Sequence, residues 1–90
     1  MTKKIELIMD FLEAIRTDGK HVRLDQNEAL VLRSLLGKAP GMLSAESLAW
    51  SALSDSTKTG AVAVYVMRLR RKLGRQAIIT VNGRGYRMAA

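Results

Sequence analysis

The sequence has no cysteine, one proline and one histidine among its 90 residues. Without cysteine it has no disulfide framework, no thiolate metal site and no cysteine nucleophile. The single histidine, His21, lacks a partner suited to a metal site, and no histidine and acid accompany the serines in a catalytic pattern. Glycine-rich phosphate-binding motifs are also lacking. We therefore expect no catalysis, no metal and no cofactor.

Long apolar runs are missing as well. Glu6, Asp10 and Glu13 interrupt the N-terminal segment, which argues against a signal peptide and a membrane span there. Ninety residues make one domain with a modest core, so we expect a single unit over 1–90. A soluble cytoplasmic protein without a membrane partner is the default expectation.

Acidic residues are absent from the C-terminal third. All eight lie at or before Asp55, and from Thr57 onward the chain carries eight basic residues and no acid. Residues 1–56 carry seven basic residues against eight acidic ones. This split indicates a near-neutral scaffold with one strongly basic surface, which is typical of proteins that bind a polyanion. The alternative is a basic domain whose charge serves solubility alone.

The hydrophobic spacing predicts a mainly α fold with a small β-hairpin. The expected order is a helix, a short strand, three helices and a C-terminal hairpin. Asp25 and Glu28 form a capping-box pattern, Ser44 is a further helix N-cap, and Asn82-Gly83 is a strong hairpin signal. The elements are expected at 3–16, 21–24, 25–37, 45–53, 57–73 and 76–88.

The predicted N-terminal helix carries a regular apolar stripe, with Ile5, Ile8, Leu12 and Ile15 at spacings of three, four and three. Two interpretations stay open. The stripe packs on the domain's own core, or it forms a homodimer interface together with Trp50, since the spacing is similar to that of a coiled coil.

The helix predicted at 57–73 separates apolar from basic residues. Val62, Val66, Leu69 and Leu73 define its buried stripe, and the opposite side collects Thr57, Gly60, Val64, Arg68 and Arg71. A DNA major groove about 12 Å wide admits one helix, whose outer face reads base edges while flanking cations meet phosphates. The candidate DNA-binding residues of this helix are Thr57, Lys58, Thr59, Val64, Arg68, Arg70, Arg71 and Lys72.

The hairpin supplies one more candidate. Arg84 lies at a glycine-flanked tip, where a long cation can enter a minor groove and sense its negative potential. The alternative is that Arg84 only keeps an exposed turn soluble.

Two runs resemble the DNA-binding domain of OmpR/PhoB-type response regulators. They are Val62–Leu73 (VAVYVMRLRRKL) and Ile79–Met88 (ITVNGRGYRM), and the similarity extends over about residues 22–88. The resemblance implies a winged helix-turn-helix, with a recognition helix in the major groove and a wing in the minor groove of double-stranded DNA. A bacterial or phage transcription regulator, associated with the nucleoid, is the implied function.

The sequence also departs from this family's pattern. No phosphoacceptor receiver domain is present, so we expect a standalone domain. The amphipathic helix predicted within 1–16 replaces the four-stranded sheet that the family places before its first helix. The second hypothesis is a protein-interaction adaptor. Its Ser54–Lys58 loop corresponds to a segment with which some relatives contact RNA polymerase.

Overall fold

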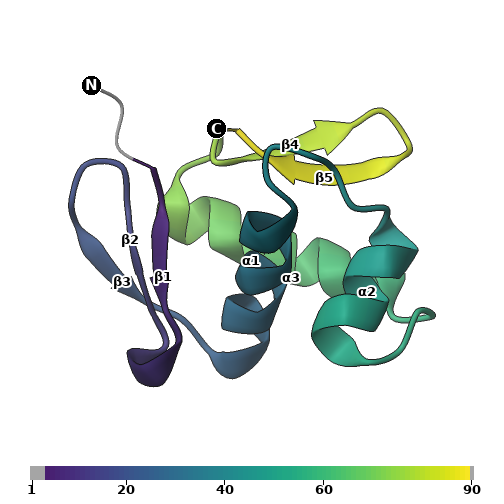
Figure 1. Ribbon diagram of the computed structural model, residues 1–90, viewed down its shortest axis with the longest axis horizontal. Coiled ribbons are helices and arrows are strands. Elements are labelled where there is room, and N and C mark those ends of the chain that lie inside the picture. The colour runs from purple at the N-terminus through teal and green to yellow at the C-terminus, as the bar shows by residue number, and fades with distance from the viewer. Residues whose placement is uncertain (1–3, 90) are drawn as a thin grey trace.

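Figure 1 shows the fold as a computed structural model, which describes residues 4–89. A three-stranded antiparallel sheet lies at one end of the molecule, and three helices and a C-terminal hairpin make up the rest. In chain order the elements are β1 (Glu6–Ile8), the 3-10 helix η1 (Met9–Phe11), β2 (Glu13–Ile15), β3 (His21–Arg23), α1 (Gln26–Lys38), α2 (Ala45–Leu53), α3 (Thr59–Leu73), β4 (Ile78–Val81) and β5 (Gly85–Met88).

The prediction of a helix at 3–16 is wrong for the described residues of that segment. Two strands replace it, and η1 reverses the chain between them, ending at Leu12 in the left-handed conformation with φ of 49°. The backbone amide of Leu24 donates to the Leu12 carbonyl at 2.8 Å, which fastens this turn to the start of α1. Lys3, the first residue of the predicted helix, lies outside the described residues.

The sheet explains why the spacing of the apolar residues in 3–16 resembles that of a helix. Leu7, Ala14 and Val22 form one cross-strand row that packs against the core, and Ala14 is fully buried. Ile8 and Ile15 alternate with that row and therefore lie on the other face of the sheet. Apolar side chains on both faces of short strands produced a pattern that also fits a helix.

The proposed coiled-coil stripe for a homodimer is thereby corrected. Ile5 and Leu12 pack against the core, whereas Ile8 and Ile15 belong to the opposite face of the sheet, so the four do not share one helical face. Trp50 lies on α2, at the end of the molecule far from this sheet, with 65% of its surface exposed. These five residues therefore do not lie on one continuous surface of the protein.

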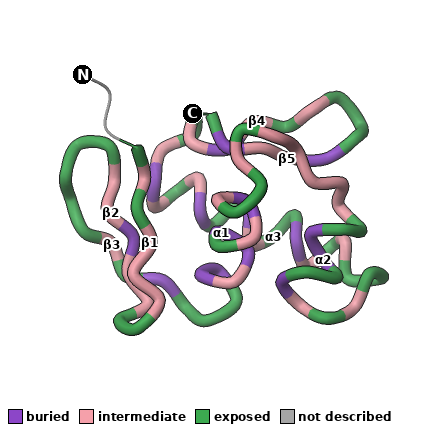
Figure 2. Tube along the Cα trace, in the orientation of Figure 1, coloured by how far each residue is buried: buried purple, intermediate pink, exposed green. Residues whose placement is uncertain are grey.

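The three helices enclose the core, and their boundaries follow from local chemistry. The Asp25 side chain accepts from the Glu28 amide, and the Glu28 side chain accepts from the Asp25 amide, so the predicted capping box of α1 is confirmed. Ser44 caps α2 with a single hydrogen bond, which its side chain accepts from the Ser47 amide. Figure 2 marks the buried positions of the three helices in purple. The fully buried larger apolar side chains include Leu32, Leu35, Leu48, Val62, Val66, Leu69 and Ile78.

The C-terminal hairpin is attached to the segment before α2. Leu43 and Tyr86 exchange two backbone hydrogen bonds of 2.9 Å. Gly85 has φ of 156°, and a Cβ at this position would overlap the carbonyl oxygen of Leu43, so only glycine fits. The predicted order of strand, three helices and hairpin is confirmed, and this part of the chain is a winged helix.

Candidate nucleic-acid interface

The exposed face of α3 is the one that the sequence predicted. Val62, Val66, Leu69 and Leu73 are buried, which confirms the inward stripe. The helix begins at Thr59 rather than Thr57, so Thr57 and Lys58 lie in the turn that precedes it. The side chains opposite the core are those of Ala63, Val64, Met67, Arg68 and Arg71, with Gly60 between them. Val64 and Met67 are 41% and 45% exposed, so this face mixes apolar and basic groups.

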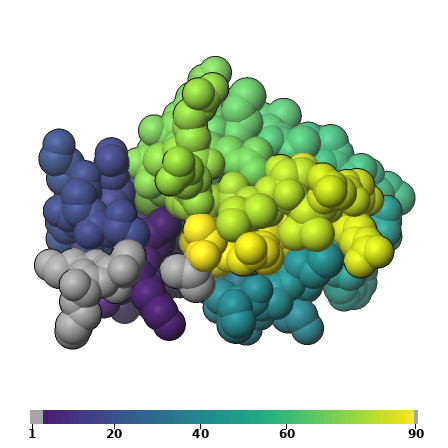
Figure 3. Space-filling view, turned by 90° about the horizontal axis from the view of Figure 1, so that it is seen from above, coloured from purple at the N-terminus to yellow at the C-terminus, as the bar shows by residue number. Residues whose placement is uncertain are grey.

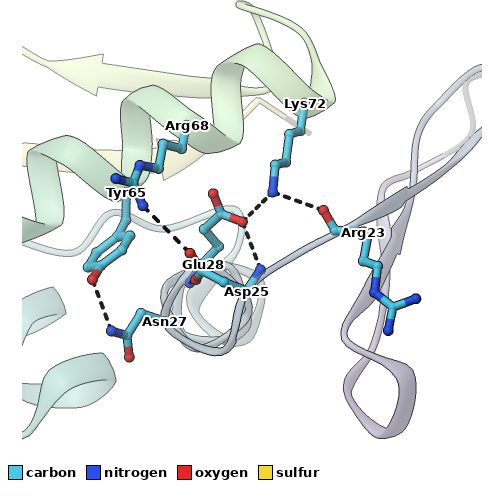
Figure 4. A network of polar contacts seen from close by, with 7 residues as sticks. All are labelled: Arg23, Asp25, Asn27, Glu28, Tyr65, Arg68 and Lys72. Atoms are coloured by element: carbon cyan, nitrogen blue, oxygen red, sulfur yellow. Dashed lines mark hydrogen bonds and ion pairs between the residues drawn. The ribbon is translucent and has the colours of Figure 1, made fainter.

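Arg68 is half exposed and is held by two neighbours. Its Nη1 atom lies 3.6 Å from Oδ2 of Asp25, and its guanidinium lies 5.7 Å from the centre of the Tyr65 ring. The Tyr65 hydroxyl in turn accepts a 2.9 Å hydrogen bond from the side-chain amide of Asn27. Figure 4 shows these contacts, which join the exposed side of α3 to the start of α1.

Lys72 has an internal role that its charge alone did not predict. Its Nζ atom donates to the Glu28 carboxylate at 2.5 Å and to the Arg23 carbonyl at 2.9 Å (Figure 4). Glu28 is only 1% exposed, so this ion pair lies between α1 and α3 and connects both to β3. The amine proposed for phosphate contact is thus engaged within the protein.

Arg70 fastens the wing to α3. Its Nε and Nη2 atoms donate to the Ile78 carbonyl at 3.1 and 2.9 Å, and Nη2 also donates to the Thr80 hydroxyl at 2.7 Å. The guanidinium therefore bridges the last turns of α3 and strand β4. Like Lys72, Arg70 belongs to the basic cluster in sequence but to the internal framework in the structure.

The remaining basic candidates are exposed. No hydrogen bond or ion pair ties the side chains of Lys58, Arg71 or Arg84 to another residue within 4–89. Arg84 closes the wing turn, where its amide donates to the Val81 carbonyl at 2.7 Å and Gly83 adopts φ of 64°. Figure 3 shows the hairpin in yellow beside the green α3 on one face of the molecule.

The turn before α3 carries its own local order. The hydroxyl and the backbone amide of Thr57 donate to Oδ1 of Asp55 at 2.6 and 2.9 Å. These two bonds, with a smaller contribution from the charge of Lys58, hold the pKa of the Asp55 carboxyl below its ordinary value. The Thr57 hydroxyl, a base-contact candidate, is therefore engaged by Asp55.

Sequence reasoning missed the side chains that join α3 to the start of α1. Asp25 and Glu28 were identified only as helix caps, and Asn27 and Tyr65 were not singled out. For these residues the capping box was the one available sequence signal. Its second carboxylate, that of Glu28, can lie beside a neighbouring helix. Met67 could have been found from its angular position, between Ala63 and Arg71 on the outer side of α3.

The structure also bears on metal binding and on membrane spans. Across residues 4–89, no three His, Cys, Asp or Glu side chains gather closely enough to bind a metal ion. In the same part of the chain, the helices are all too short or too polar to cross a membrane.

Helices α2 and α3, the turn between them and the wing that packs on α3 define a winged helix-turn-helix. The family described as "Transcriptional regulatory protein, C terminal" matches residues 19–88. The chain belongs to this family, the OmpR/PhoB-type DNA-binding domains.

Known relatives agree with this assignment. Over 74 residues the chain is 45% identical to the transcriptional regulatory protein CutR of Streptomyces coelicolor, covering 79% of this chain and 34% of that protein. It is 39% identical to the response regulator protein PmrA of Pseudomonas aeruginosa over 74 residues, covering 80% and 34% of the two chains. The chain thus spans about a third of the length of the curated relatives it matches.

Solved structures show the same fold. The DNA-binding domain of CpxR from E. coli is similar with a TM-score of 0.78 and 28% identity, over 100% of this chain and 96% of that one. The DNA-binding domain of the response regulator AdeR, solved in complex with an intercistronic region, has a TM-score of 0.79 and 22% identity, over 98% and 96% of the two chains.

Proposed function

We propose that this protein is a transcription regulator that binds double-stranded DNA with sequence specificity, placing α3 in the major groove and the wing in the minor groove. The observation that carries this proposal is the division of α3, whose apolar stripe is buried while Val64, Arg68 and Arg71 lie on the opposite, exposed face. A helix of that kind fits a major groove, where base edges are distinguishable.

Each exposed group has a chemical role in this arrangement. Arg68 can donate two hydrogen bonds to a guanine edge, and Val64 can contact a thymine methyl group. Lys58 and Arg71 neutralise phosphates, Thr57 and Thr59 supply hydrogen-bonding groups near the N-terminus of α3, and Arg84 enters the minor groove. Arg70 and Lys72 act indirectly in this proposal, because their internal bonds fix the wing and α3 in place.

The relatives support the same proposal. CutR is a transcriptional regulatory protein, and the AdeR domain was solved with an intercistronic region. A regulator of this kind acts on the bacterial chromosome, in the cytoplasm. The adaptor hypothesis is not favoured, since no comparison points to it. Contact of loop 54–58 with RNA polymerase, and pairing of two copies on DNA, stay predictions.

The experiment begins with selection of bound duplexes from a random pool, followed by titration of the selected duplex and of random duplex. Arg68→Ala is expected to lower the preference for the selected sequence by about 1–3 kcal/mol, the value of a bidentate base contact. Arg33→Ala is the matched control, because it removes the same charge from an exposed position of α1.

Two results would contradict the proposal. One is that the wild-type protein enriches no sequence from the pool. The other is that Arg68→Ala and Arg33→Ala change the sequence preference by the same amount. Paired half-sites at a fixed spacing in the enriched duplexes would, in addition, report that two copies bind together.

A further inference from the structure

The Asp25 carboxylate serves two partners at once. Its Oδ1 atom accepts the 2.7 Å hydrogen bond from the Glu28 amide that caps α1, and its Oδ2 atom lies 3.6 Å from Nη1 of Arg68. Figure 4 shows that this places a negative charge from the start of α1 beside the arginine that we assign to base reading. One side chain therefore couples the framework to the proposed recognition surface.

Capping alone does not require this charge. Ser44 caps α2 with a neutral hydroxyl, which accepts from the Ser47 amide at 3.0 Å. Serine and asparagine are as effective as aspartate at this position of a helix. The cap therefore does not need the negative charge of Asp25. The cation next to this charge is Arg68.

The other contacts of Arg68 define the same orientation. The guanidinium lies over the Tyr65 ring, and the Asn27 side chain holds the Tyr65 hydroxyl. Asp25 and Arg68 each have half of their side-chain surface exposed, so incoming DNA can reach the pair. A half-exposed ion pair is weak enough to be replaced by a stronger contact.

We propose that Asp25 is a specificity-determining residue that competes with a base edge for Arg68 and so limits the discrimination between cognate and non-cognate DNA. This inference rests on the proposed function. A bidentate contact with a guanine edge outweighs a half-exposed ion pair, whereas a single screened phosphate contact is too weak to replace it. Because Arg68 must leave Asp25 to reach a base edge, the pair lowers cognate affinity by its full strength, while a non-specific complex keeps the pair intact. Specificity is the difference between these two affinities.

The test compares Asp25→Asn with the wild-type protein. Asparagine keeps the cap and the volume of the side chain while removing its charge. We expect the affinity for the selected duplex to increase about two- to fivefold more than that for random duplex, which is the range set by an exposed ion pair. The ratio of the affinity for the selected duplex to that for random duplex therefore rises.

Asp18→Asn is the matched control. Asp18 forms a comparable exposed pair with Arg16, at 3.2 Å, and removing it changes the net charge by the same amount. Because this pair lies in the loop between β2 and β3, we expect Asp18→Asn to change both affinities alike. An unchanged ratio in Asp25→Asn, with circular dichroism confirming a folded protein, would overturn the inference.

A measurement without DNA tests the contact itself. In NMR relaxation of the free protein, the Arg68 Nε–H group is expected to be ordered in the wild type and to become mobile in Asp25→Asn. Equal mobility in both proteins would overturn the inference while leaving the proposed function intact. A wild-type protein that prefers no sequence would instead overturn the proposed function, and this inference with it.

Discussion

At the scale of single residues, the buried carboxylate of Glu28 joins three parts of the chain. It accepts from the Asp25 amide at 2.9 Å and from the Lys72 ammonium, which also donates to the Arg23 carbonyl. A buried charge requires such partners, because removing it from water without compensation is costly. Lys72 is consequently a structural residue as well as a basic one.

Glu28→Ala tests this role. We expect it to lower the free energy of unfolding by about 2 kcal/mol, less than for a fully buried pair because the Lys72 side chain is partly exposed. Urea denaturation measures the change. Glu46→Ala removes an exposed acid from the first turn of α2 and should cost less than about 1 kcal/mol. Equal losses in the two variants would contradict the assigned role of Glu28.

Gly85 allows a second residue-scale prediction. Gly85→Ala should destabilise the protein by about 3 kcal/mol, since the new Cβ meets the Leu43 carbonyl and φ is positive. In Gly37→Ala the added Cβ meets open space within α1, so this variant should gain up to about 1 kcal/mol. Thermal unfolding separates the two, and a Gly85→Ala variant as stable as Gly37→Ala would contradict the packing of the wing.

At the scale of elements, the α2–α3 turn contains a carboxylate, that of Asp55, whose pKa is set mainly by hydrogen bonds from Thr57. Because the Thr57 hydrogen bonds lower the pKa of Asp55 in the folded state, their stabilisation is present above the ordinary aspartate pKa. It is lost as the pH falls through the lowered value.

Thr57→Val removes the hydroxyl donor, so the pKa of Asp55 should rise toward its ordinary value. An NMR titration of the Asp55 carboxyl carbon measures this change. Thr59 lies two residues later and makes no bond to Asp55, so Thr59→Val should leave the titration midpoint of Asp55 unchanged. If the midpoint in Thr57→Val equals that in the wild type, the hydroxyl does not set this pKa.

The elements also show what could be predicted from the sequence. Capping residues and uninterrupted helical spacing located α1, α2 and α3 to within two residues, and Asn82-Gly83 located the wing turn. The N-terminal strands were missed because they are three residues long and their pairing partners are set by tertiary contacts, which spacing along the chain does not contain. The internal partners of Arg70 and Lys72 were missed for the same reason, since they belong to other elements that tertiary packing brings beside α3.

At the scale of the whole molecule, the basic C-terminal third contains two contrasting sets of side chains. Arg70 and Lys72 hold the framework together, while Lys58, Arg71 and Arg84 face solvent. Charge counting alone cannot separate these sets, although only the second is free to neutralise phosphates. The salt dependence of DNA binding distinguishes them, because each phosphate contact contributes about −0.9 to the log–log slope.

Arg71→Ala is therefore expected to reduce the magnitude of that slope by about 0.9 and to weaken binding to all DNA sequences alike. Lys72→Met, which removes an engaged amine, should lower the free energy of unfolding and leave the slope unchanged. Titrations of a fixed duplex at several salt concentrations measure both. A smaller slope in Lys72→Met at full folding would instead place its amine on a phosphate.

The most direct test of the central claim, that the exposed side of α3 and the wing tip contact DNA, is an NMR map of amide shifts on titration with a selected duplex. We expect the largest changes within Thr59–Arg71 of α3 and at 82–84 of the wing. Largest changes around Phe11 and Trp50, with α3 unaffected, would contradict it.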